Sequence, residues 1–176
     1  MRIMIVALIF FFSTACFADE TWSLKTLSIV LANDLKQTFK DESENVNMYI
    51  FASPFAQVKI VALNKAPQNQ ADVQAWQLDM LGKQIAFWQQ SSKLPLDSQK
   101  EVLNNKPNTD KIGKYTYQTV DMSFPSQNVK FLNVVNNEVT YMFTLMSFDQ
   151  DSKQRKEQMD KLVKELSSVE LKPIKK

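Results

Sequence analysis

Continuous and alternating apolar runs fill most of the chain and predict a fold dominated by β-strands. The clearest unit is residues 129–148, VKFLNVVNNEVTYMFTLMSF, in which β-branched and aromatic runs flank Asn136-Asn137. This pattern predicts a β-hairpin with a tight turn at the two asparagines. In the second run both alternating sets of positions are largely apolar, so we expect a central strand covered on both faces.

Four further runs rich in apolar and β-branched residues predict strands at 27–31, 48–52, 57–63 and 115–122. Ser53-Pro54 lies between two of them, and a proline there is typical of a turn or a sheet edge. The whole sequence contains two glycines. Asn and Asp tolerate left-handed backbone best among the other residues, so turns are expected at Asn33-Asp34 and Asn104-Asn105.

Residues 73–90 have the period of an amphipathic helix, with Asp72 as the expected N-cap. At roughly 100° per residue, the large apolar side chains fall in one broad arc, which should pack flat on a sheet. The arc consists of Val73, Trp76, Met80, Leu81, Ile85, Phe87 and Trp88. Aromatic residues at this spacing are usually core, and Trp88, at the edge of the arc, is the exception that we single out as a ligand contact.

A second helix should begin at Asp151 or Ser152 and end at Leu166, with Asp149 and Asp151 satisfying free N–H groups at its start. The polar connection at 91–113 contains a possible short helix at 98–103. Connections of this length are either functional or mobile. The order is therefore strands, helix, long connection, three antiparallel strands and helix, which defines an α+β class with helices against a mostly antiparallel sheet.

This arrangement resembles the PsbP/DcrB/Mog-type fold, an α/β/α sandwich around an antiparallel sheet. The resemblance covers residues 22–171 and includes the early strand LSIVL, the Trp-containing helix, and Ser147-Phe148 before the last helix. Where relatives have a Pro-x-x-Trp turn, this chain has Ala32-Asn33-Asp34-Leu35. Members assist a photosystem, bind a small GTPase or occur in bacterial envelopes. The resemblance thus implies a non-enzymatic accessory or binding module, and it transfers no functional residue to this chain.

Residues 1–18 have the composition of a secretory signal peptide, with Arg2, an apolar run at 3–12 and a small-residue cleavage site ending at Ala18. We therefore expect residues 19–176 to form a single exported domain without a transmembrane segment. Cys16 is the one cysteine of the sequence. Cleavage before Cys16 would instead give an acylated outer-membrane lipoprotein that serves as an envelope accessory.

Composition argues against most enzymatic chemistry. The sequence has no histidine, which removes Ser-His-Asp catalysis and His-based zinc sites. Two glycines leave no phosphate-binding loop, and a formal net charge of +2 argues against a nucleic-acid partner. Asp41, Glu42 and Glu44 fall in an expected solvated hairpin loop. They keep a carboxylate hydrolase open as a third alternative and a calcium site as a weaker one.

We therefore expect a non-enzymatic binding or accessory protein with no cofactor and no metal, acting in the periplasm or beyond it. Its partner would be a protein or an anionic surface. Besides Trp88, the candidate contacts are three lysines of the long connection: Lys93, Lys106 and Lys111. A small exported domain without a catalytic set is also similar to substrates of type II secretion in Gram-negative bacteria, which suggests an effector.

Overall fold

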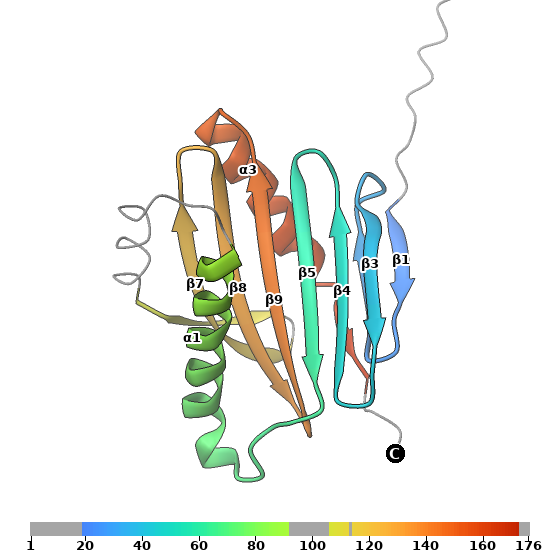
Figure 1. Ribbon diagram of the computed structural model, residues 1–176, viewed down its shortest axis with the longest axis vertical. Helices are drawn as coiled ribbons and strands as arrows, with labels where there is room; N and C mark the ends of the chain where they lie inside the picture. The colour runs from blue at the N-terminus through green and yellow to red at the C-terminus, as the bar shows by residue number, and fades with distance from the viewer. Residues whose placement is uncertain (1–18, 92–105, 113, 173–176) are drawn as a thin grey trace, which may run out of the picture.

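A seven-stranded sheet in which every neighbouring pair of strands is antiparallel forms the centre of the molecule (Figure 1). The computed structural model describes residues 19–91, 106–112 and 114–172. The strand order is β3-β4-β5-β9-β8-β7-β6. The strands are β3 (Lys36–Glu42), β4 (Val46–Ala52), β5 (Ala56–Leu63), β6 (Asn108–Ile112), β7 (Tyr115–Ser123), β8 (Gln127–Asn136) and β9 (Val139–Phe148).

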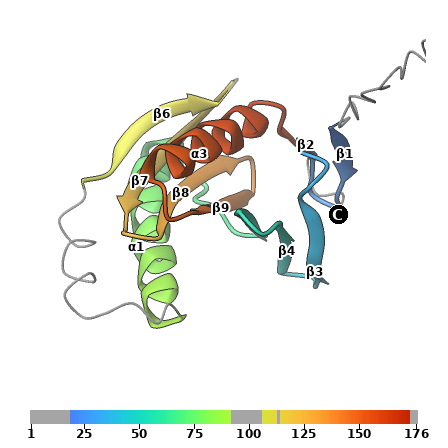
Figure 2. The same cartoon turned by 90° about the horizontal axis from the view of Figure 1, so that it is seen from above.

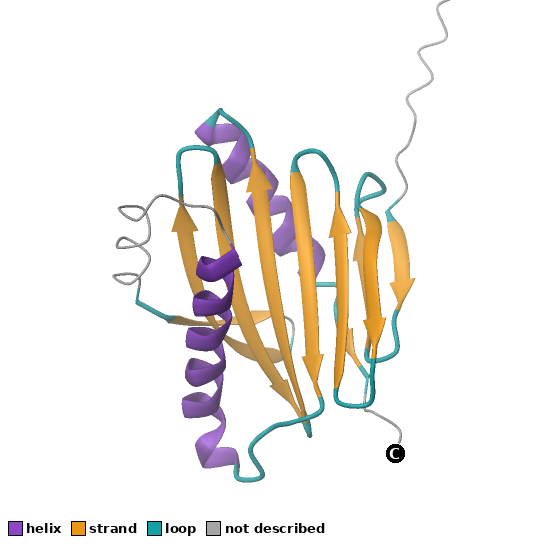
Figure 3. Cartoon of the chain, in the orientation of Figure 1, coloured by secondary structure: helices purple, strands orange, loops and turns teal. Residues whose placement is uncertain are grey.

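Two helices lie on opposite faces of this sheet (Figure 2). Helix α1 (Val73–Ser91) packs on β7, β8 and the neighbouring part of β9, and helix α3 (Ser152–Leu166) packs on β8 and β9 from the other side. A small antiparallel sheet of β1 (Glu20–Ser23), β2 (Leu27–Leu31) and β10 (Glu170–Leu171) lies on the α3 side (Figure 3). We call the α3 side the inner face and the α1 side the outer face.

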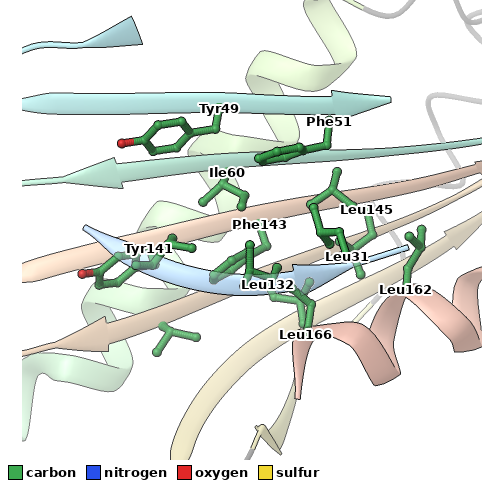
Figure 4. Packing of buried hydrophobic residues seen from close by; sticks show 14 of the residues in the cluster. Leu31, Tyr49, Phe51, Ile60, Leu132, Tyr141, Phe143, Leu145, Leu162 and Leu166 are labelled. Carbon is green, nitrogen blue, oxygen red and sulfur yellow. The ribbon is translucent and has the colours of Figure 1, made fainter. Parts of the chain in front are cut away.

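The inner face carries the main hydrophobic core (Figure 4). Side chains from β4, β5 and β9 meet those of β2 and α3 there, and Tyr49, Phe51, Ile60, Tyr141 and Leu145 have no exposed surface. Burying a side chain of this size stabilises the fold by about 1.5–3 kcal/mol. This dense core fixes the orientation of the central strands, and thereby the side chains that they present on the outer face.

The predicted hairpin and central strand are confirmed, with the turn displaced by one residue. Asn136 pairs with Val139, so the two-residue loop is Asn137-Glu138. Asn137 has φ 55°, the left-handed region that asparagine tolerates. Strand β9 lies at the middle of the sheet, as predicted from the apolar residues on both of its faces.

Helix α3 begins and ends as predicted, and the Asp151 side chain caps it by accepting a hydrogen bond from the Lys153 N–H at 2.8 Å. Helix α1 begins at Val73 as expected, but the prediction that Asp72 caps it is wrong. A single 3₁₀ turn at Gln70–Asp72 precedes the helix, and the Asn69 side chain accepts from the Ala71 N–H at 3.1 Å instead. Helical backbone conformation therefore begins three residues earlier than the apolar period predicts.

The α+β class with a mostly antiparallel sheet is confirmed, but several polar strands were missed. The segment predicted to be a solvated hairpin loop contains the end of edge strand β3, so Asp41 and Glu42 are strand residues. Edge strand β6 adds a fourth strand to the three expected in the second half of the chain. The short helix expected at 98–103 and the turn at Asn104-Asn105 lie outside the described residues.

Candidate functional site

The outer face of the sheet is covered by α1 over only part of its width. In Figure 1 the helix lies in front of β7 and β8 and beside β9, whereas no helix of the described residues lies in front of β5 and β4. The uncovered strands still present apolar side chains on this face, among them Met48, Ile50, Val61 and Leu63. The result is a groove with a wall formed by α1 and a floor formed by β4, β5 and β9.

This groove has a volume of about 490 Å³ and a predominantly apolar lining. Four of the eight methionines of the sequence line it: Met48, Met80, Met142 and Met146. Methionine is flexible and polarisable, and it is common on surfaces that adapt to apolar ligands. The volume lies within the range of about 300–1,000 Å³ that is usual for small-molecule sites.

Helix α1 runs parallel to β9, so regularly spaced hydrogen bonds join the wall of the groove to its floor. Trp76 Nε1 donates to Thr140 Oγ1 at 2.8 Å, and Gln84 Nε2 donates to Thr144 Oγ1 at 2.8 Å. Four helical residues rise about 6 Å and two strand residues rise about 6.8 Å, so each helical turn meets every second residue of β9. These two hydrogen bonds position Met80 beside Met142, which lies between them.

Strand register arranges the floor of the groove in rows across β4, β5 and β9. In one row Val61 pairs with Met48 on one side and with Met142 on the other. In the next row Lys59 lies between Ile50 and Thr144. The floor therefore combines an apolar row with an adjacent row that carries a positive charge.

Lys59 is half-buried, and burial lowers the pKa of its ammonium group. Its Nζ lies 4.8 Å from the centre of the Phe87 ring, which projects from α1 across the groove. No carboxylate among the described residues pairs with Lys59. The ammonium group is therefore held by a cation–π contact, which is weaker than a desolvated ion pair.

The two adjacent aromatic residues of α1 differ in burial. Phe87 was expected in the core, but it is 61% exposed, and that prediction is wrong. Trp88, singled out from the sequence as a ligand contact, is 9% exposed and packs against Phe124 and Phe131 with ring centres 5.5 and 5.6 Å away. Because α1 lies over β7 and β8, the Trp88 side of the arc is covered and the Phe87 side borders the groove. Trp88 still lines the groove with part of its surface.

The lysines singled out from the sequence lie away from this groove. Lys93 is outside the described residues. Lys106 is exposed, and Lys111 is exposed on β6, at the opposite end of the strand order from the uncovered strands. Nearby Lys114 borders a separate polar pocket of about 590 Å³ beside α1 and β7. The structure therefore brings Trp88 to the groove and leaves Lys106 and Lys111 at the far edge.

Lys59 and Phe87 are the groove residues that sequence reasoning missed, although a signal was present. The alternate positions of β4 and β5 are apolar on both faces, as in Met48, Ile50, Val61 and Leu63. The sequence predicts two long helices, of which one packs on each face. One helix of about 10 Å diameter cannot cover the outer face of a sheet this wide.

Glu42, one of the carboxylates considered for hydrolysis, makes structural contacts. Glu42 accepts a hydrogen bond from the Tyr49 hydroxyl at 2.7 Å and pairs with Lys40 at 3.0 Å, and these contacts lower the pKa of Glu42. In the part of the chain that the structure describes, no three residues among His, Cys, Asp and Glu are grouped closely enough to hold a metal ion. None of the helices in the described ranges is long and apolar enough to cross a membrane.

Solved structures show which fold this is. No protein-family model matches the sequence, and no curated protein matches it. The solution structure of the PsbP protein (CyanoP) of Synechocystis sp. PCC 6803 matches with a TM-score of 0.54 at 9% identity, over 90% of this chain and 95% of that one. A crystal structure from Bacteroides thetaiotaomicron VPI-5482 matches with a TM-score of 0.52 at 11% identity and covers 88% of this chain. The match spans 49% of the Bacteroides chain. At these identities the likeness defines the fold alone, and the fold is PsbP-like.

Proposed function

We propose that this chain is an exported, non-enzymatic binding protein whose binding site is the groove on the outer face of the sheet. The observation that carries the proposal is the uncovered apolar floor of β4, β5 and β9 beside α1. Contiguous exposed apolar surface in a water-soluble fold marks an interaction site, because leaving it exposed has a free-energy cost. The signal-peptide pattern of residues 1–18 supports export.

Further features of the groove suit binding rather than catalysis. Two of its polar side chains, Thr144 and Gln84, are hydrogen-bonded to each other, and Gln84 Nε2 also donates to the Phe143 carbonyl at 2.8 Å. An apolar pocket with a few fixed polar groups is the usual composition of a ligand site. The methionine side chains can adjust their rotamers to the shape of the ligand.

The test is the binding of Nile red, a neutral dye that fluoresces in apolar surroundings. Val61→Lys adds a charge to the floor of the groove and should weaken dye binding at least about tenfold, because the dye would have to desolvate that charge. Leu78→Lys adds the same charge on an exposed position of α1 that does not line the groove, and it should leave binding unchanged. Circular dichroism checks that both variants are folded. Equal binding by all three proteins would contradict the proposal.

The site of action is tested by intact mass combined with fractionation of the producing cells. A chain beginning at Asp19 in the periplasm or the culture medium supports the exported form, and its presence in the medium supports a secreted effector. A chain beginning at an acylated Cys16 in the membrane fraction would replace this form with a lipoprotein that acts as an envelope accessory.

A further inference from the structure

A half-buried lysine that pairs with no carboxylate of residues 19–91, 106–112 and 114–172 is the least explained feature of the groove. Lys130 on β8, in contrast, is a partly buried lysine that has an acidic partner. The Lys130 side chain is 12% exposed, and its Nζ lies 2.7 Å from an Asp121 carboxylate oxygen. Lysine is seldom buried unless it is paired, because desolvating an unpaired ammonium group is costly. Lys59 is also partly buried, but no carboxylate of the described residues pairs with it.

The neighbours of Lys59 show which shape of ligand would supply that carboxylate. Along β5, Val61 lies two residues away on the same face and is flanked by Met48 and Met142. Leu63 continues the same apolar face beyond Val61. The Lys59 ammonium group is thus followed along β5 by an apolar trough, the arrangement that matches a molecule with an anionic head and a hydrocarbon tail.

Phe87 holds the ammonium group at the mouth of the trough. The contact of 4.8 Å between Lys59 Nζ and the ring centre keeps the lysine head near α1 rather than extended into water. The ring is largely exposed, so its outer surface remains accessible. A carboxylate reaching Lys59 would meet the ammonium beside this ring and gain a charge-assisted hydrogen bond where the dielectric constant is lowered.

We propose that the groove binds a long-chain monocarboxylate, with its head group on Lys59 Nζ and its hydrocarbon chain along Val61, Met48 and Met142. This inference rests on the proposed function and adds the chemical class of the ligand. Lys83 also lines the groove, but its Nζ is paired with Asp79 at 2.7 Å, which leaves Lys59 as the lining lysine without a carboxylate among the described residues. One unpaired ammonium group, with no arginine in the lining, matches a head group of single charge better than a phosphate. The volume of about 490 Å³ suits a free acyl chain rather than a protein segment.

The experiment compares decanoate with 1-decanol, which has the same chain and no charge, by displacement of Nile red at pH 7. The unmodified protein should bind decanoate about tenfold or more tighter than 1-decanol, the usual effect of a hydrogen bond to a charged group. Lys59→Met keeps the apolar volume and should bind both ligands equally. Lys59→Arg keeps the charge and should retain the preference.

Lys111→Met is the matched control, because it removes an equivalent charge from β6, away from the groove, and it should keep the preference for decanoate. Equal affinity for decanoate and 1-decanol in the unmodified protein would overturn the inference while leaving the proposed function intact. A preference that persists in Lys59→Met would also overturn it. If Val61→Lys does not weaken the binding of Nile red, both the inference and the proposed function are overturned. Thermal unfolding confirms that each variant is folded.

Discussion

The two faces of the central sheet differ in how completely they are covered. On the inner face, α3 and the small sheet cover β4, β5 and β9, and Phe51, Ile60 and Phe143 are at most 2% exposed. On the outer face of the same strands, Met48, Val61 and Met142 are only partly buried and line a groove. The same backbone therefore supplies a packed core on one side and a binding surface on the other. Stability should depend on the inner face, and recognition on the outer one.

The largest expected effect compares two phenylalanines, one on each side. Phe51→Ala, at a site with no exposed surface, should lower the free energy of unfolding by about 3–5 kcal/mol. Phe87→Ala, at a site that is 61% exposed, should lower it by less than about 1 kcal/mol. Urea unfolding monitored by circular dichroism measures both. Similar losses would mean that the outer face is packed as tightly as the inner one.

An intermediate effect is expected where α1 is attached to the outer face. Gln77 is 3% exposed, and its Nε2 donates to the carbonyl oxygens of Thr116 at 3.2 Å and Asn133 at 3.1 Å. Gln77→Ala leaves these acceptors without that donor and should cost about 1–3 kcal/mol of unfolding free energy. Gln74→Ala, at an exposed position of the same helix, should change it by less than about 0.5 kcal/mol. An unchanged free energy of unfolding in Gln77→Ala would show that α1 is held by its apolar contacts alone.

A smaller, pH-dependent effect is expected on the inner side at Glu165 of α3. Burial raises the pKa of this carboxyl group, so folding favours its protonated form. That contribution is fully present below the ordinary pKa of about 4.3 and is lost as the pH rises through the raised value. Glu165→Gln should therefore raise the Tm by about 2 °C or more at pH 7 and have no effect near pH 4. Glu157→Gln, on the exposed side of α3, is the matched control and should leave the Tm at pH 7 nearly unchanged.

The smallest expected effect concerns the unliganded groove. Burial lowers the pKa of Lys59, so the unfolded chain binds its proton more tightly and stability rises as the pH increases from the lowered value to about 10.4. At pH 7 the charged form is the disfavoured one, and Lys59→Met should raise the Tm by about 1 °C. The gain should shrink in alkaline solution. A fall in Tm at pH 7 would mean that Lys59 stabilises the fold rather than serving a ligand.

The sequence predicted elements that carry a local apolar pattern and missed those that tertiary pairing alone creates. Strand β9 and helix α3 were recognisable because their apolar periods and caps are local features. Edge strand β3, KQTFKDE, has largely exposed side chains and is a strand because its backbone pairs with β4. No local pattern distinguishes such a segment from a loop.

The apolar positions of β4 and β5 were a signal for an uncovered face, but the sequence could not show which side chains border it, for a related reason. The helical arc grouped Phe87 with Trp88, and periodicity cannot show which part of an arc lies over the sheet. Gln77 is buried on that helix because it hydrogen-bonds to strand carbonyls. One of these belongs to Asn133, which is 56 residues away in the sequence. The sequence analysis did not single out Lys59, because only the folded sheet shows that no carboxylate of the described residues lies against it.

The most direct test of the account is methyl NMR of the protein with its methionines ¹³C-labelled, during titration with decanoate and, separately, with 1-decanol. Met48, Met80, Met142 and Met146 line the groove, whereas Met159 packs in the inner core. The account predicts that the four groove methyl signals shift with a common saturation curve while the Met159 signal stays in place. Unchanged groove signals, or shifts centred on Met159, would contradict the claim that the uncovered outer face is the binding site.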